Sequence, residues 1–283
     1  MPLHRPFPSS AGLPCAPLAA LVTAALVSWA GAAGANPRPL PFSYQHEQIA
    51  KGAAELEQYV DLTPVRAQDA ATGELRWYGL SQFATEFEYG LSDRLELGLY
   101  VTYAPAASSG FSNVVSPPDG NGMKQRLRFK LAETGEWPID VSLYGETVEN
   151  EREFELEAKV ILQRRFGMAR LIANASAEQE FYYDGKHDLV LNPSAGLTFE
   201  LSPTIQPGIE WWMRAEYPLE DPPDPRPFQL GPHHYLGPTV LLQFGALWWT
   251  TGIYFRLSEA SHTMNLGEGF GAIWARSVLG IEL

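Results

Sequence analysis

The sequence predicts an all-β fold: a closed antiparallel transmembrane β-barrel of about twelve strands that follows a cleaved signal peptide. Three observations support this fold class. From residue 54 onward, apolar and polar residues alternate with a period of two. Short and long connections follow one another in a regular order, as they do in outer-membrane barrels. Helical spacing is sustained nowhere over three turns after residue 60.

Residues 1–35 have the features of a secretory signal peptide. A weakly positive start is followed by an apolar run at 18–29, and Ala33-Gly34-Ala35 supplies a small-residue cleavage site. Cys15 precedes the apolar run, so it does not occupy the position of a lipoprotein cysteine. We therefore expect export, with residues 36–283 as the mature chain.

Charge and cysteine content exclude several classes of protein. The chain carries 33 acidic and 20 basic side chains, a net charge of −13. This charge argues against nucleic acid and anionic lipid headgroups as electrostatic partners. Residues 36–283 contain no cysteine, so the exported chain is not a small disulfide-stapled scaffold.

Residues 36–53 are rich in proline and are interpreted as a periplasmic N-terminal leader, loose or briefly helical. Residues 54–283 are interpreted as the barrel. Its predicted strands are about 10–13 residues long, enough to cross an apolar band of about 25 Å at the usual tilt. The twelve predicted strands are 54–64, 78–90, 93–104, 122–132, 137–147, 152–164, 168–182, 188–201, 204–217, 234–244, 247–257 and 271–283.

The hairpin at 83–103 shows the alternation most clearly. Phe83 and Phe87 share one face of the first strand, while Glu86 and Glu88 lie on the other. A half-buried strand of a soluble periplasmic β-sandwich or lipocalin-like protein could show the same pattern. In lipid, the apolar face points outward and the charged face lines the interior, and the backbone must then close into a barrel to satisfy its hydrogen bonds.

The lengths of the connections favour the barrel. The connections after the second, fourth, sixth, eighth and tenth predicted strands have two to four residues. Most of those after odd strands are long, such as 105–121 and 218–233. Outer-membrane barrels have short periplasmic turns and longer extracellular loops, and an even number of strands.

Three prolines and one uncharged stretch are the weakest points of this interpretation. Pro193, Pro207 and Pro238 each remove a ladder donor, so we expect bulges or shifted strand ends there, and ten strands are an alternative. Residues 236–255 contain no charge, but their glycines and threonines favour a hairpin that turns near Gly245 over a transmembrane helix.

The charged faces of the strands define the predicted lumen. A basic strand flanked by acidic ones can form ion pairs across neighbouring strands. Either these pairs fill a closed interior, or they line a water-filled channel whose opposed charges set selectivity. The predicted pore-lining residues are Glu86, Glu88, Arg94, Glu96, Arg126, Arg128, Lys130, Asp140, Glu146, Glu153, Glu155, Glu157 and Lys159.

No catalytic constellation is evident, and we expect no cofactor. The sequence has no nucleophile elbow, zinc-protease motif or phosphate loop. His233 and His234 are adjacent and point to opposite faces of a strand, so we expect no metal site there. Outer-membrane lipases use a Ser/His pair on the outer wall, and this sequence does not identify such a pair.

Four segments carry a family resemblance: ELEQYVDLT (55–63), FATEFEYGLSDRLELGLY (83–100), FELEAKVILQRRF (154–166) and HYLGPTV (234–240). Over most of the mature chain they resemble a poorly characterised family of Gram-negative outer-membrane β-barrels, porin-like and related to the "MetA pathway of phenol degradation" group. The resemblance implies a barrel in the outer membrane.

The sequence as a whole predicts an outer-membrane barrel in contact with lipid that passively conducts small solutes through a charged lumen. One alternative is a closed structural or adhesive barrel without transport. A second is an outer-membrane enzyme that acts on lipid, although we expect the chain not to be an enzyme.

Overall fold

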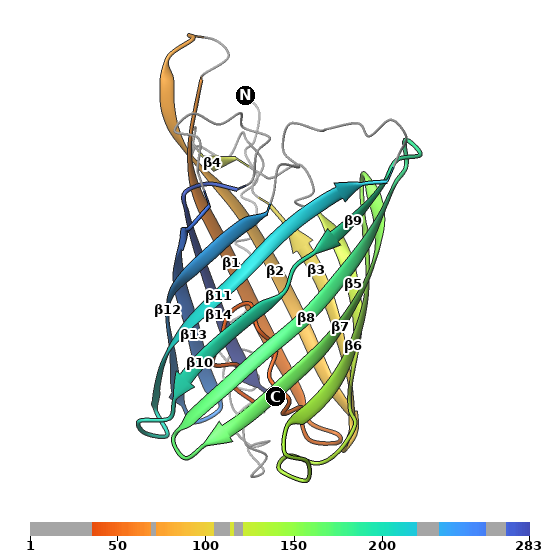
Figure 1. Cartoon of the computed structure of the whole chain (residues 1–283), viewed down its shortest axis with the longest axis vertical. Coiled ribbons are helices and arrows are strands. Elements are labelled where there is room, and N and C mark those ends of the chain that lie inside the picture. The colour runs from red at the N-terminus through yellow and green to blue at the C-terminus, as the bar shows by residue number, and fades with distance from the viewer. Residues whose placement is uncertain (1–35, 69–71, 105–113, 116–120, 220–231, 259–269) are drawn as a thin grey trace, which may run out of the picture.

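A single sheet forms the molecule and curls into a closed antiparallel barrel (Figure 1). The structure, a computed structural model, describes residues 36–68, 72–104, 114–115, 121–219, 232–258 and 270–283. The ring closes because β1 (Ala54–Gln68) pairs with both β14 (Ile273–Glu282) and β2 (Leu75–Ser92). Closure leaves no open sheet edge in the wall, as a β-structure that crosses hydrocarbon requires.

The remaining strands follow one another around the ring in chain order. They are β3 (Leu95–Tyr103), β4 (Val114–Val115), β5 (Gly122–Lys130), β6 (Asp140–Asn150), β7 (Glu153–Phe166), β8 (Ala169–Tyr182), β9 (His187–Leu191), β10 (Ser194–Phe199), β11 (Ile205–Pro218), β12 (His233–Phe244) and β13 (Leu247–Arg256). Each pairs with its neighbours in the ring, except the two-residue β4, which lies outside it, and the short β9 and β10, which share one position.

Among the described residues, the ring has twelve strand positions, as predicted. The short strands β9 and β10 share one position, because both pair with β8 and β11. Pro193 lies between them, at the place where the sequence predicted an interruption. The two-residue β4 pairs with β2 in parallel, outside the ring. The twelve-strand barrel is thus confirmed, and the ten-strand alternative is wrong.

The other two prolines also lie at irregularities of the ladder. The β10–β11 ladder ends at the pair Thr198 and Gly208, and Pro207 lies one residue beyond this end. Pro238 lies in a gap of the β12–β13 ladder, whose pairing skips from Leu236 to Thr239. Each proline therefore avoids a position that needs its missing N–H.

The wall is apolar outside and polar inside. On β2, Phe87 is 38% exposed, whereas the neighbouring Glu86 is completely buried in the interior. Trp249 likewise faces outward, while Trp248 turns inward and donates a hydrogen bond to Glu55. This orientation confirms the predicted arrangement, and the soluble sandwich with an apolar core is wrong. Other exposed apolar side chains are Leu99, Val101, Leu127, Phe129, Leu156 and Ile253.

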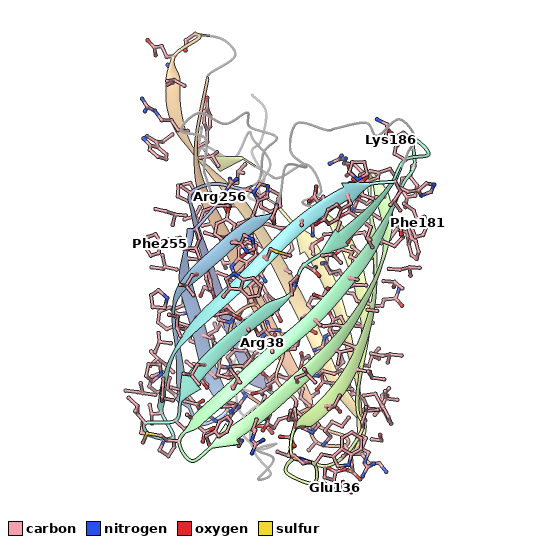
Figure 2. All side chains as sticks on the ribbon, in the orientation of Figure 1. Arg38, Glu136, Phe181, Lys186, Phe255 and Arg256 are labelled. Atoms are coloured by element: carbon pink, nitrogen blue, oxygen red, sulfur yellow. The ribbon has the colours of Figure 1, made fainter. Side chains whose placement is uncertain are left out.

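The two ends of the barrel differ in their connections. At one end, strands are joined by short turns such as 245–246, where Gly245 takes a φ of 64°. At the other end lie the longer connections, of which 105–113 and 220–231 are outside the described residues. Figure 2 marks the two ends with Glu136 and Lys186. By the usual orientation, the short turns face the periplasm.

Residues 1–35, the predicted signal peptide, lie outside the described residues. Within the part of the chain that the structure describes, no helix has the length and apolar character needed to cross a membrane.

Residues 36–49 occupy the interior of the barrel's periplasmic half. The sequence predicted that they belong to a leader at 36–53 ahead of the barrel, loose or briefly helical. In the structure this segment forms neither helix nor strand, and most of its side chains are buried. Pro37, Pro39 and Pro41 favour an extended backbone, which explains why no helix forms here.

Candidate functional site

The candidate site is a cavity of about 370 Å³ in the extracellular half of the lumen. It extends to the outer end of the wall, where Asn150 ends β6, Glu153 begins β7 and Tyr182 ends β8. Its volume lies within the range that small-molecule sites usually have. We call this cavity the vestibule.

One wall of the vestibule is strongly acidic, because alternate residues of β6, β7, β8 and β11 point inward. The cations on this wall are shared among carboxylates: Arg214 contacts Glu180 at 2.5 Å, Glu216 at 2.7 Å and Glu178 at 3.5 Å. The lining carboxylates of these four strands are Glu146, Glu153, Glu155, Glu157, Glu178, Glu180 and Glu216.

Glu155 shows most clearly that this wall carries excess negative charge. Its side chain lies at the vestibule wall and is largely buried. Its hydrogen-bond donor is the Asn150 side-chain amide, 3.4 Å away. Within the described residues, no lysine or arginine nitrogen lies within ion-pair distance of this carboxylate. By contrast, Glu146 and Glu157 pair with Lys124 and Lys159.

An aromatic cluster adjoins the acidic wall at β11. Trp212 stacks on Tyr235 at a centroid distance of 4.3 Å and meets Trp274 edge-on at 5.2 Å. Residues 36–49 are called the inserted segment below. Phe42 of this segment stacks on Trp212 at a centroid distance of 4.4 Å. The vestibule thus has an acidic wall and an adjoining aromatic cluster, and Phe42 and Tyr44 line it from the inserted segment.

Below the vestibule, the lumen is filled by a network of charges centred on Arg126. The guanidinium of Arg126 is completely buried and contacts Glu86 at 2.7 Å, Glu96 at 2.6 Å and also Glu88. Arg128 binds the second oxygen of Glu96 at 2.7 Å. The opposite charges of these side chains pair with one another inside the ring of strands. Side chains therefore fill this part of the lumen.

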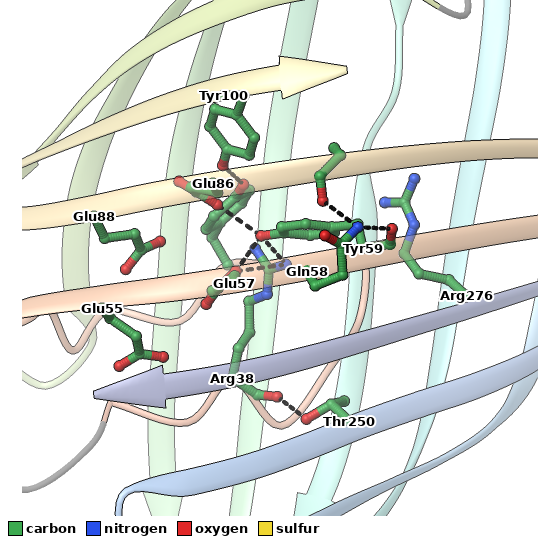
Figure 3. Close-up of polar contacts among 12 residues, drawn as sticks. Arg38, Glu55, Glu57, Gln58, Tyr59, Glu86, Glu88, Tyr100, Thr250 and Arg276 are labelled. Atoms are coloured by element: carbon green, nitrogen blue, oxygen red, sulfur yellow. Dashed lines mark hydrogen bonds and ion pairs between the residues drawn. The ribbon is translucent and has the colours of Figure 1, made fainter. Parts of the chain in front are cut away.

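The inserted segment joins the same network through Arg38 (Figure 3). Its guanidinium donates to the Tyr59 hydroxyl at 2.5 Å and lies 3.6 Å from Glu57. The hollow beside Arg38, Gln45 and Arg128 is too narrow for a water molecule. Within the described residues, the vestibule therefore does not continue to the periplasmic end.

The structure divides the predicted pore-lining residues into three groups. Glu146, Glu153, Glu155, Glu157 and Lys159 line the vestibule. Five more belong to the buried network beneath it. The remaining three lie at the periplasmic turn. The network group is Glu86, Glu88, Glu96, Arg126 and Arg128, and the turn group is Arg94, Lys130 and Asp140.

The placement of Arg94 in the lumen was wrong. A register shift between Gly90 and Ser92 delays the start of β3 to Leu95, so Arg94 falls in the turn. Its side chain is 42% exposed and contacts Glu133 at 2.7 Å. Hydrogen bonds from Arg94 and Lys130 hold the pKa of the Glu133 carboxyl below its ordinary value.

Sequence reasoning missed several lumen residues. Glu178, Glu180 and Arg214 obey the alternation of β8 and β11, so the same pattern could have found them. Asn174 and Glu210 face inward by the same alternation, but nothing in that pattern shows that they contact residues 36–49. Their role depends on a segment whose entry into the lumen the pattern does not reveal.

Comparisons with known proteins find similarity in structure alone. No family model matches the sequence, and no curated protein matches it. Among solved structures, the porin NanC aligns with a TM-score of 0.53 and 6% identity, covering 80% of this chain and 98% of that one. The chain has the fold of an outer-membrane β-barrel. At this identity, the similarity shows the fold and leaves function open.

Two further structures align over similar lengths. A bacterial polysaccharide outer-membrane secretin has a TM-score of 0.43 and 9% identity, covering 83% of this chain and 99% of that one. LpxR from Salmonella typhimurium has a TM-score of 0.43 and 7% identity, covering 80% and 99%. Both scores are too low to support a functional argument. The porin-like fold is shown, whereas the link to the phenol-degradation group stays a prediction.

Proposed function

We propose that this barrel is a passive outer-membrane channel for small solutes that favours cations. The observation that carries the proposal is the vestibule: a cavity of about 370 Å³ that reaches the extracellular end of the lumen. Passage of a solute requires such a hollow, whereas a purely structural role does not.

The preference for cations follows from the charge of the vestibule wall. Seven carboxylates of β6, β7, β8 and β11 and Asp61 of β1 line it, against the five cations Lys124, Arg152, Lys159, Arg214 and Arg276. A cleft of one charge sign between low-dielectric walls raises the local concentration of the opposite ion. The adjoining aromatic side chains also suit organic cations, which bind over the faces of aromatic rings.

Conductance of residues 36–283 in a planar bilayer tests this function. We expect discrete conductance steps from barrels in which residues 36–49 have left the lumen. In a salt gradient, the reversal potential should have the sign that cation preference gives. Glu155→Gln and Glu178→Gln should reduce that preference, because each removes a negative charge from the wall. Glu133→Gln is the matched control, since Glu133 lies at the periplasmic turn and should leave the preference unchanged.

Two other outcomes would contradict the channel. A bilayer that stays sealed, including with variants that release residues 36–49, supports the closed structural barrel. Release of fatty acid from phospholipid supports the lipid-acting enzyme, and we propose that none is released. Ser142 Oγ does lie 2.8 Å from His46 Nδ1, but both side chains are completely buried inside the lumen, away from lipid.

A further inference from the structure

Side chains of the barrel wall bind the backbone of residues 36–49 as they would bind a peptide ligand. The Asn174 amide accepts a hydrogen bond from the Tyr44 N–H at 2.7 Å and donates to the Tyr44 carbonyl at 2.9 Å. The Glu210 carboxylate accepts from the N–H groups of Phe42 and Ser43, the latter at 2.6 Å. The backbone bends at residues 39–43, so two consecutive N–H groups reach the same carboxylate.

Further wall residues hold both ends of the segment. Glu96 accepts a hydrogen bond from the Ile49 N–H at 2.9 Å, and Gln163 accepts from the His46 N–H at 3.2 Å. At the other end, the Thr250 hydroxyl donates to the Arg38 carbonyl (Figure 3). The contacts come from strands all around the ring, so the segment crosses the whole lumen.

Three alternating side chains of the segment fit places that the wall provides. Leu40 is completely buried against Gly196. A Cβ added to Gly196 would lie only 2.5 Å from the Leu40 side chain. Phe42 lies between Trp212 and Arg276, whose guanidinium is 3.8 Å from the ring centroid. A glycine in a strand interior at the point of closest approach indicates a site shaped for this occupant.

Tyr44 supplies the third anchor. Its hydroxyl lies 2.6 Å from the Tyr100 hydroxyl, and its ring is surrounded by cations. Arg38 lies 4.5 Å from the ring centroid, and Lys159 lies 5.0 Å from it. The prolines before and between Leu40, Phe42 and Tyr44 fix φ at alternate positions of the segment, which restricts its backbone in advance.

The barrel wall itself does not depend on the segment. Closure rests on the β1–β2 and β1–β14 ladders, which begin at Ala54 and Glu55, after the segment ends. A turn at 50–53 joins the two, with Gly52 at a φ of 82°. Gly90 faces this turn, and a Cβ there would lie 2.2 Å from the Ala50 carbonyl oxygen. The segment therefore lies outside the ladders that close the ring and joins the wall at the turn that contains Gly52.

The interface is polar and incompletely satisfied. Both amide atoms of Gln48, Nε of Arg38 and Nε2 of His46 are buried without a hydrogen-bond partner among the described residues. Release of the segment lets these atoms and the wall side chains bind water instead. A buried polar network that is only partly satisfied stabilises an interface less than a complete one.

We propose that residues 36–49 are a displaceable plug, bound as a peptide in a site of the barrel wall, and that their release opens the lumen. The binding stands on the contacts above, while its consequence for transport rests on the proposed channel function.

The plug is tested by cysteine labelling of the mature chain, residues 36–283, which has no cysteine of its own. Ser43 is completely buried, so Ser43→Cys reports release of the plug to a water-soluble maleimide. Thr204→Cys, at an exposed turn, gives the unprotected rate. We expect Ser43→Cys to label far more slowly than Thr204→Cys in the refolded barrel.

Substitution of the wall then tests the site. Asn174→Leu removes both hydrogen bonds between the wall and the Tyr44 backbone. The loss of two hydrogen bonds of ordinary strength should make labelling of the Ser43→Cys thiol roughly 5- to 150-fold faster. Asn192→Leu is the matched control, because the Asn192 side chain contacts Glu178 in the vestibule. Phe42→Ser, which leaves the wall intact, should also accelerate labelling if Asn174→Leu fails to fold.

The outcomes separate the plug from the channel. Equal labelling of Ser43→Cys in the Asn174→Leu and Asn192→Leu backgrounds overturns the plug, and so does unprotected labelling of Ser43→Cys in the unaltered wall. Faster labelling together with larger conductance supports both proposals. Faster labelling in a bilayer that stays sealed supports the displaceable plug and counts against the channel.

Discussion

Removal of the Arg126 charge should destabilise the barrel more than any surface charge does. Arg126 is completely buried and has three carboxylate partners, Glu86, Glu88 and Glu96, together with the Tyr100 hydroxyl. In Arg126→Met, the three carboxylates lose their shared cation inside the wall. Breaking a buried pair in this way costs about 3–5 kcal/mol of unfolding free energy.

The assay is urea unfolding of the refolded barrel, followed by tryptophan fluorescence. With a slope of about 3 kcal/mol per molar urea, a loss of about 4 kcal/mol lowers the midpoint by roughly 1 M. Arg94→Met is the control, since the exposed pair between Arg94 and Glu133 contributes only about 0–1 kcal/mol. Glu86→Gln added to Arg126→Met should recover part of the loss, because it removes one unpaired charge.

Equal midpoints for Arg126→Met and Arg94→Met would refute this reasoning. They would mean that water reaches the periplasmic half of the lumen and screens the carboxylates. In that case residues 36–49 would not fill it.

Three further substitutions probe the outer wall, the turn at 50–53 and the inward tryptophan. Leu99→Arg places a charge on the exposed outer face of β3 and should cost about 2–4 kcal/mol of folding in lipid, measured as a lower yield of refolded barrel. Gly90→Val should push against the Ala50 carbonyl and raise the labelling rate of Ser43→Cys, whereas Gly145→Val, in open space on the outer face, should not. Trp248→Phe removes the hydrogen bond to Glu55 and should lower the unfolding free energy by about 1–3 kcal/mol in the urea assay.

The wall of the barrel could be predicted from the sequence because its physics is local. Phe87 lies on the outer face of the wall and Glu86 faces the lumen. The same alternation with a period of two recurs along the strands, so it can be read from the sequence. Pro193 could likewise be recognised as a break, since proline lacks the donor that a ladder needs. Strand ends shifted by a few residues, as at Arg94, because the bulge near Gly90 depends on the tertiary arrangement.

The inserted segment could not be predicted in the same way. Its residues contact wall positions more than 100 residues distant, such as Asn174 and Glu210, and no periodicity links them. Alternation also shows that Arg126 and Glu155 face inward without showing that one lies in a filled network and the other in a cavity. That difference depends on where residues 36–49 come to lie.

The central claim is an apolar wall around a lumen that is hollow in its extracellular half and plugged in its periplasmic half. A scan of single cysteines along β7 tests this claim most directly. In lipid vesicles, a water-soluble maleimide should label cysteines that replace Glu153, Glu155 or Glu157. It should spare those that replace the lipid-facing Phe154 and Leu156 and those that replace the buried Ile161 and Gln163. Labelling at 154 and 156 but not at 153 and 155 would contradict the inside-out wall. Full labelling at 161 and 163 would contradict the plug.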